Sequence, residues 1–193
     1  MKIYVSLMSV LLITLSLIGC SGEKRSPLET SIYNADNDKI GTATFTEQPE
    51  GVQIKLKVEG LEQGMHGVAI HEFPKCEAPE FKSAGNHFNP LSKEHGLMNP
   101  QGAHAGDLPN VEADPSGMID VKLMLPEAKL KEDQMSLLRK EGTSIVIQSG
   151  PDDGMSQPAG NSGERVACGK ITLDADQDET SDPTEPDKKQ KKN

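Results

Sequence analysis

Three of the five histidines in this 193-residue chain lie within one stretch, between Gly85 and Asp107. They are His87, His95 and His104, and Asp107 follows three residues after the last of them. Three imidazole nitrogens and one carboxylate oxygen form a suitable tetrahedral set for zinc. Four protein ligands leave no open position for water, so the set predicts a structural zinc ion. The alternative is that these are surface histidines that bind no metal.

The spacing of these residues requires a loop that wraps around the ion. The separations along the chain are eight, nine and three residues, so the three histidines do not share one face of a helix. Two long irregular segments are expected, Glu72–Gly117 and Ser149–Gly163, and the first contains the cluster. Loops of that length inside a compact domain are usually functional or held by a bound group.

The segments around these loops alternate between apolar and polar residues with a period of two, as β-strands do. The pattern is clear in VQIKLKVEG, GTATFTEQ and MIDVKLMLP, and shorter strands are expected in TSIVIQSG and ERVACGKITL. Gly, Pro, Asn and Asp lie between the strands as turn residues. This predicts an all-β domain, an antiparallel sandwich or barrel. Lys129–Glu141 is expected to form a short helical turn.

The N-terminus predicts export. Lys2 precedes an apolar run that ends at Ile18, which is typical of a signal peptide over residues 1–19 and short for a membrane-spanning helix. The LIGC sequence that ends at Cys20 resembles a bacterial lipobox. We therefore expect Cys20 to be lipidated and to anchor an extracytoplasmic lipoprotein to the bacterial cell membrane, with residues 20–30 as a tether. The alternative is an ordinary signal peptide.

Charge and aromatic content indicate the nature of the C-terminal segment and the class of partner that the protein could bind. Residues 174–193 are acidic and then rich in lysine, which predicts a disordered charged tail and leaves the domain at 31–173. The net charge is −10, and aromatic residues make up 3% of the chain, with no tryptophan. A nucleic-acid-binding protein needs a basic stripe or stacking rings, so we expect no nucleic-acid partner.

Two cysteines remain if Cys20 carries lipid, namely Cys76 and Cys168. An exported protein meets oxidising conditions, so an even number of cysteines indicates one disulfide. The alternative is a pair of buried thiols.

Four blocks of the sequence resemble, in the same order, the copper–zinc superoxide dismutase family. The blocks are GMHGVAIHEF, GNHFNPLSKEHG, HAGDLPNVEAD and GNSGERVACG. The resemblance extends over residues 31–173 and implies a Greek-key β-barrel of about eight antiparallel strands with two long loops. Bacterial members of this family are exported, which agrees with the signal peptide.

The resemblance also implies roles for individual residues. Arg165 corresponds to the arginine that draws superoxide toward copper. Asp152 corresponds to the carboxylate that orients a zinc-ligand histidine, here His95, and a copper-ligand histidine. His66 corresponds to a structural histidine in the barrel. The implied zinc ligands and disulfide are those already singled out: His87, His95, His104 and Asp107, and Cys76 with Cys168.

The copper side of the pattern is incomplete. The family uses four histidines for copper, one of which bridges to zinc, and the resemblance places that bridging residue at His87 and a second ligand at His71. The other two positions hold Ala69, which has no donor atom, and Gln148, whose amide oxygen is a weak neutral donor. Dismutation needs a metal that changes oxidation state, and zinc does not.

We therefore expect a zinc-binding superoxide dismutase-like lipoprotein that binds copper weakly and has little or no activity toward superoxide. One alternative is an active copper–zinc superoxide dismutase that protects the cell envelope from superoxide. The other is a non-enzymatic envelope module that binds metal or a partner. Met98 and Met155 lie in the long loops, where thioethers could contact copper(I) or merely pack. The sequence does not determine whether the barrel dimerises.

Overall fold

The computed structural model describes residues 26–131 and 133–173. The predicted signal peptide, Cys20 and the tail at 174–193 lie outside these residues. The described residues form nine strands and one 3-10 helix, and none of their helices could span a membrane. The elements are β1 (Leu28–Asn34), β2 (Lys39–Gln48), β3 (Gly51–Val58), β4 (Gly64–His66), β5 (Val68–His71), η1 (Lys82–Ala84), β6 (Val111–Ala113), β7 (Ile119–Pro126), β8 (Thr143–Gln148) and β9 (Arg165–Ile171).

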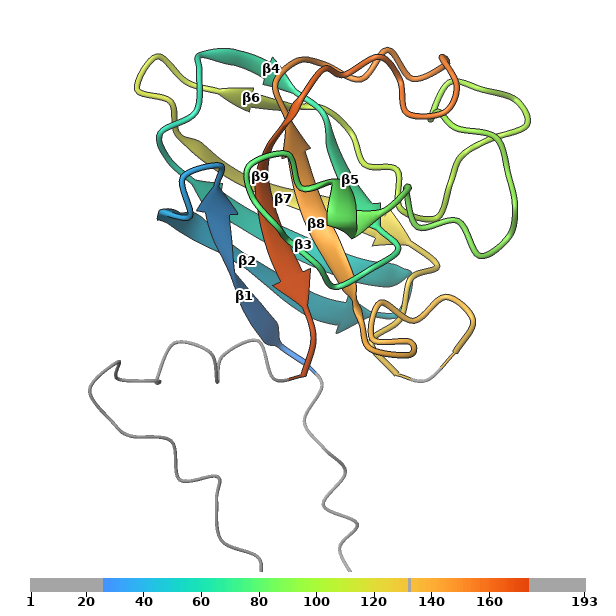
Figure 1. Cartoon of the computed structure of the whole chain (residues 1–193). Helices are drawn as coiled ribbons and strands as arrows, with labels where there is room; N and C mark the ends of the chain where they lie inside the picture. Colours follow the sequence, from blue (N-terminus) through green and yellow to red (C-terminus); the bar gives the residue numbers. More distant parts are fainter. Residues whose placement is uncertain (1–25, 132, 174–193) are drawn as a thin grey trace, which may run out of the picture.

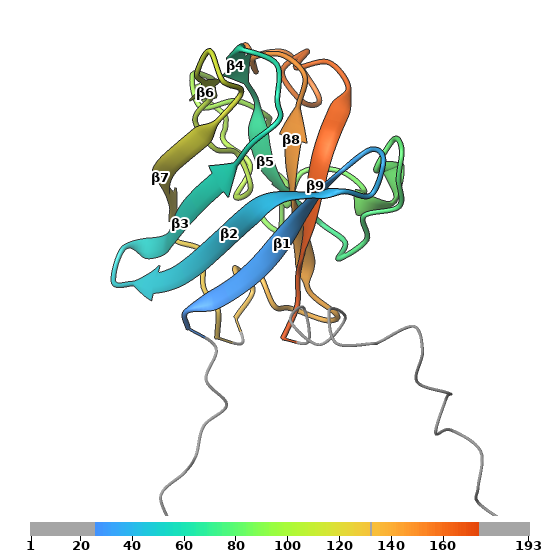
Figure 2. The same cartoon turned by 90° about the vertical axis from the view of Figure 1, so that its left-hand side faces the viewer.

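Seven strands form one curled antiparallel sheet in the order β5-β8-β9-β1-β2-β3-β7 (Figures 1 and 2). The short strands β4 and β6 form a second, two-stranded sheet. Because β4 leads into β5 at one edge and β6 leads into β7 at the other, this pair connects the two edges. The predicted all-β Greek-key barrel is confirmed.

The core lies inside the curl of the sheet and follows the predicted period of two. In β3, Ile54 and Leu56 are fully buried, whereas Lys55 between them is exposed. They pair with Phe45 and Ala43 of β2, which are also fully buried. Each large apolar side chain buried in this way stabilises the fold by roughly 1.5–3 kcal/mol.

Strand β8 is buried on both faces, so side chains on its outer face can take part in a buried site. Ile145 and Ile147 point into the barrel core. Val146 points to the opposite face and packs in a smaller cluster under the first long loop. Gln148 shares that outer face by strand alternation. The outer face of β8 is therefore covered by a loop rather than by solvent.

The helical turn predicted over Lys129–Glu141 is wrong. The described residues there form turns and a parallel bridge between Lys129 and Ser136. Leu130 and Leu137 are fully buried in the barrel core, and the N–H of Leu137 donates to the carbonyl of Lys129 over 2.8 Å. The irregular path of this segment places both leucines in the barrel core. Their packing outweighs a weak helical preference.

The two long loops lie side by side on one side of the barrel (Figure 1). The N–H of Met98 in the first loop donates to the carbonyl of Gly154 in the second over 3.2 Å. Gly96 has φ of 112°, and a side chain there would collide with the carbonyl of Gly154. Glycine at this position therefore allows the two backbones to approach closely.

Candidate metal centre

The four predicted zinc ligands converge in the first long loop. The ligand atoms of His87, His95, His104 and Asp107 all lie within 4.8 Å of one another. The Nδ1 atoms of the three histidines, in that order, are 2.8, 3.1 and 3.4 Å from Oδ1 of Asp107. A tetrahedral zinc ion with bonds of about 2.0 Å would hold its ligand atoms about 3.3 Å apart. The donor set therefore fits zinc.

Backbone groups of the same loop hold the carboxylate of Asp107 in place. Its Oδ2 accepts the N–H of Gly96 over 2.9 Å and that of His104 over 3.0 Å, which leaves Oδ1 facing the histidines. Burial raises the pKa of Asp107, but contacts with His104, His87 and the Gly96 N–H outweigh burial and bring it well below its usual range. Asp107 is thus a buried anion that a cation would neutralise.

One ligand atom of the cluster has only a long contact, 3.4 Å from Nδ1 of His104 to Oδ1 of Asp107. Among the described residues, Nδ1 of His104 is buried and makes no hydrogen bond. An unpaired buried polar atom costs about 1–3 kcal/mol, and a metal ion bound at the centre of the cluster would remove that cost. This is independent support for a bound cation.

Asp152, in the second long loop, contacts His95, one of the four predicted zinc ligands. The second contact that the resemblance implies, with a copper-ligand histidine, is not among its hydrogen bonds in the described residues, which otherwise go to Gly154 and Asn110. The Oδ1 atom of Asp152 lies 3.0 Å from Nε2 of His95. A carboxylate on the far nitrogen fixes the orientation of a ligand ring and increases its basicity. Gly160 has φ of 67°, and any side chain there would collide with Asp152 and crowd His95.

Two amide side chains that the sequence analysis missed brace this arrangement. Asn110 exchanges two hydrogen bonds of 2.8 Å with the backbone of Asp152. Gln157 accepts the N–H of His95 over 2.9 Å and donates to its carbonyl over 3.0 Å. Both partners are backbone groups, so no sequence signal separates these residues from other loop amides.

His71 lies beside His87, which is one of the four cluster residues. Their ring centroids are 4.9 Å apart. Nδ1 of His71 lies 3.0 Å from the carbonyl oxygen of Gly85, which only accepts, so the proton is on Nδ1 and the lone pair on Nε2. Burial, followed by the neighbouring His87, lowers the pKa of His71 to about 3, so the ring is neutral.

The other two positions of the family's copper site do not supply imidazole. Ala69 is buried in β5 and offers only a methyl group. Gln148 is buried at the end of β8, and its Oε1 has no hydrogen-bond partner. Copper(II) prefers a tetragonal set of nitrogen and oxygen donors. Two imidazole nitrogens and one amide oxygen do not complete that set.

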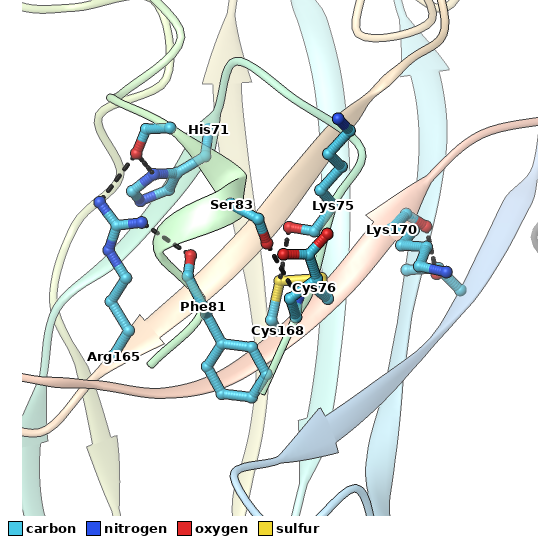
Figure 3. The surroundings of a disulfide bond; sticks show 11 residues. His71, Lys75, Cys76, Phe81, Ser83, Arg165, Cys168 and Lys170 are labelled. Carbon is cyan, nitrogen blue, oxygen red and sulfur yellow. Dashed lines mark hydrogen bonds between the residues drawn. A yellow bond between two sulfur atoms is a disulfide. The ribbon is translucent and has the colours of Figure 1, made fainter. Parts of the chain in front are cut away.

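Arg165 links the start of β9 to the backbone next to His71 (Figure 3). Its two terminal nitrogens donate to the carbonyls of Phe81 and Gly85, each over 2.8 Å. The carbonyl of Gly85 thus accepts from both Arg165 and His71. The guanidinium holds the first long loop and remains close to the histidine pair.

The disulfide between Cys76 and Cys168 is formed, as the sequence and the family resemblance predicted (Figure 3). The two cysteines are 92 positions apart in the chain, and their Cα atoms are 5.6 Å apart. Phe81 and Val146 pack in the same small apolar cluster as Cys168. The disulfide therefore ties the start of the first long loop to strand β9.

The remaining candidate residues lie apart from the metal cluster. His66 is buried, with its ring nitrogens 2.7 and 2.8 Å from the carbonyl oxygens of Gln148 and Glu62, which agrees with a structural role. Met98 is 67% and Met155 48% exposed where the two loops meet. Their thioethers do not belong to the buried cluster.

Comparisons with known proteins agree with this geometry. The sequence model described as copper/zinc superoxide dismutase (SODC) matches residues 39–171. The chain belongs to this family. Among its relatives, Superoxide dismutase (Cu-Zn) 2 of Aquifex aeolicus is 45% identical over 170 residues, covering 86% of this chain and 98% of the relative. The superoxide dismutase-like protein YojM of Bacillus subtilis is 36% identical over 186 residues, covering 86% of this chain and 94% of the relative.

Solved structures of the superoxide dismutase family show the same fold. A superoxide dismutase-like protein from Bacillus subtilis superposes with a TM-score of 0.72 at 37% identity, covering 74% of this chain and 97% of that chain. A double mutant of a protein with that description has a TM-score of 0.73 at 39% identity, covering 75% of this chain and 96% of that chain. In this mutant, a tyrosine and a proline are replaced by histidine.

Proposed function

We propose that this protein is a zinc-binding superoxide dismutase-like lipoprotein of the bacterial cell envelope with weak or no superoxide dismutation. The observation that carries the proposal is the contrast between two adjacent donor sets. The zinc set is complete, with three imidazoles and one carboxylate within 4.8 Å of one another. The copper set retains His71 and His87 but has Ala69 and Gln148 at the other two positions.

The loss of these two ligands bears directly on the reaction. Dismutation reduces one superoxide ion and oxidises another, so the metal must alternate between two oxidation states. Zinc has a filled d shell and does not do this. Removing even a residue that orients a metal ligand typically costs 10–100-fold in affinity or activity. The absence of two ligands should therefore weaken copper(II) binding by more than that.

The proposed role of zinc is structural. His87, His95, His104 and Asp107 come from a loop whose described residues form one short 3-10 helix and no strand between β5 and β6. The ion would fix this loop, and through His95 and Asp152 it would also fix the second loop. The predicted signal peptide and the lipobox at Cys20 support an envelope location.

An active superoxide dismutase remains the second candidate, because Arg165 lies where it could guide superoxide. Arg165 supports dismutase activity only if copper binds. Its two hydrogen bonds to loop carbonyls also give this side chain a structural role. The Aquifex aeolicus relative is named as a copper–zinc superoxide dismutase at 45% identity. Activity measured with copper supplied separates the two candidates.

The deciding experiment compares the wild type with the Ala69→His/Gln148→His double variant after loading with zinc and copper. We expect little dismutation from the wild type and an increase of at least about 100-fold in the variant, because two imidazole ligands are restored. Lys55→His on the exposed face of β3 is the control for an added histidine away from the site. Rapid dismutation by the wild type would overturn the proposal.

A further inference from the structure

An exposed thioether lies where the two long loops meet. Among the methionines that the structure describes, Met98 is the most exposed, at 67%, followed by Met155 at 48%. Cys76 and Cys168 are joined in the disulfide, so the thioethers are the reduced sulfur atoms of the described residues. Dissolved peroxide oxidises accessible methionines to the sulfoxide. Met98 is therefore the methionine that peroxide should reach first.

The side chain of Met98 packs on the backbone of the second loop at Gly154. A Cβ atom added to Gly154 would lie 3.0 Å from Cε of Met98 and 3.4 Å from its Cγ. The N–H of Met98 also donates to the carbonyl of Gly154 over 3.2 Å. The methyl end of the thioether thus covers Gly154, and the absence of a side chain on this glycine leaves room for it.

Gly154 is hydrogen-bonded to the carboxylate that faces one of the predicted zinc ligands. Its N–H donates to Oδ1 of Asp152 over 2.7 Å, and the same oxygen lies 3.0 Å from Nε2 of His95. In the first loop, Met98 lies in a turn three residues after His95. Met98 is therefore connected to His95 through both loops, along its own chain segment and through Gly154 and Asp152.

Oxidation would change this apolar contact into a polar one. The sulfur attacks one oxygen of hydrogen peroxide, and an S–O bond forms as the O–O bond breaks. The leaving hydroxide takes the proton of the transferred oxygen and becomes water, and the sulfur loses the two electrons that peroxide gains. The sulfoxide is polar and disrupts apolar contacts of methionine. We propose that Met98 is a peroxide-sensitive modification site whose oxidation loosens the junction of the two loops and weakens zinc retention.

This inference rests on the proposed structural zinc and adds a form of regulation to it. Removing a carboxylate that orients a metal ligand typically costs 10–100-fold in metal affinity. Met98 acts on Asp152 only through Gly154, so the expected effect is at the lower end of that range, about 10-fold. Methionine sulfoxide reductases restore the thioether, so the change is reversible.

The test is treatment of the zinc-loaded wild type with hydrogen peroxide, followed by peptide mass spectrometry and by zinc transfer to a chromophoric chelator. Met124, which is 36% exposed on strand β7, is the internal comparison away from the loops. We expect Met98 to be oxidised before Met124 and zinc transfer to become about 10-fold faster. A methionine sulfoxide reductase should restore the original rate.

Two variants assign the effect to one side chain. Peroxide should leave zinc transfer unchanged in Met98→Leu, whereas the matched control Met124→Leu should respond as the wild type does. Three results would overturn the inference: oxidation of Met124 before Met98, an unchanged rate in the oxidised wild type, or a faster rate in oxidised Met98→Leu.

Hydrogen exchange separates this inference from the proposed function. The N–H groups of Met98 and Gly154 report the junction of the loops in protein with and without zinc. We expect both groups to exchange faster after oxidation, and unchanged exchange would overturn the inference while leaving zinc binding intact. Failure of the unoxidised protein to bind zinc would instead overturn the proposed function, and the exchange rates would then still decide whether oxidation loosens the junction.

Discussion

At the scale of single residues, the chemistry depends on which nitrogen of each imidazole faces which neighbour. All three cluster histidines direct Nδ1 toward Asp107, while Nε2 of His95 faces Asp152. The convergence of these four residues into one cluster could be predicted from the sequence. The choice of nitrogen could not, because it is set by loop packing and by backbone donors such as the Gly96 N–H.

Removing the charge of Asp107 tests whether the cluster binds zinc or is a chance grouping of histidines and a carboxylate. We expect Asp107→Asn to weaken zinc binding by at least about 100-fold, because a ligand oxygen and the anion that balances the metal are lost together. Zinc competition with a chelator measures this. Asp114→Asn is the control, since Asp114 accepts bonds only within its own turn. Equal zinc affinity in the two variants would contradict the assignment.

Asp153 gives a prediction for pH dependence in the second loop. Hydrogen bonds from the side chain and N–H of Ser156 and from the N–H of Met155 lower the pKa of Asp153 to about 2. A lowered carboxyl pKa stabilises the fold above the usual value of 3.8, and this contribution is lost as pH falls toward 2. An NMR titration should show this pKa rising in Ser156→Ala. An unchanged pKa in that variant would show that the hydroxyl contributes nothing.

At the scale of elements, the first long loop is attached to β9 at several points. The disulfide joins Cys76 to Cys168, and Arg165 donates to the carbonyls of Phe81 and Gly85. The disulfide could be predicted from cysteine count, export and the family resemblance. The carbonyl acceptors could not, because every residue has a backbone carbonyl and its direction depends on the folded loop.

Removal of the disulfide should destabilise the domain strongly. For a closed loop of this length, the chain-entropy model gives about 4–5 kcal/mol in the free energy of unfolding. We expect Cys76→Ser/Cys168→Ser to lose an amount of this order in urea unfolding, with faster amide exchange in the first long loop. Wild-type protein unfolded after reduction is the control. A loss below about 1 kcal/mol would mean that the other attachments hold the loop alone.

At the scale of the whole molecule, the barrel core and the metal centre are separate. The core lies inside the curled sheet, and the candidate zinc ligands lie on a loop outside it. Alternation along strands such as Gly51–Val58 made the strands predictable. The pairing of β4 with β6 was not predictable, because it joins segments about fifty residues apart. The helical turn at Lys129–Glu141 failed because packing of Leu130 and Leu137 overrides local preference.

This separation predicts the effect of metal removal. We expect chelation of zinc to increase amide exchange over residues 85–107 by a large factor while strands β2, β3 and β7 stay protected. The melting temperature should fall, since an ion at 1,000 times its dissociation constant stabilises the folded state by about 4 kcal/mol. Hydrogen exchange read segment by segment measures both regions. Simultaneous loss of protection in the barrel strands would contradict a loop-bound structural ion.

The most direct test of the central claim is the metal content of the protein after aerobic loading with equal zinc and copper(II), followed by dialysis against a mild chelator. The four-ligand cluster and the two missing imidazoles predict about one zinc per chain and no tightly held copper(II). One zinc and one copper(II) retained per chain would contradict the account, because the second site would then be complete despite Ala69 and Gln148.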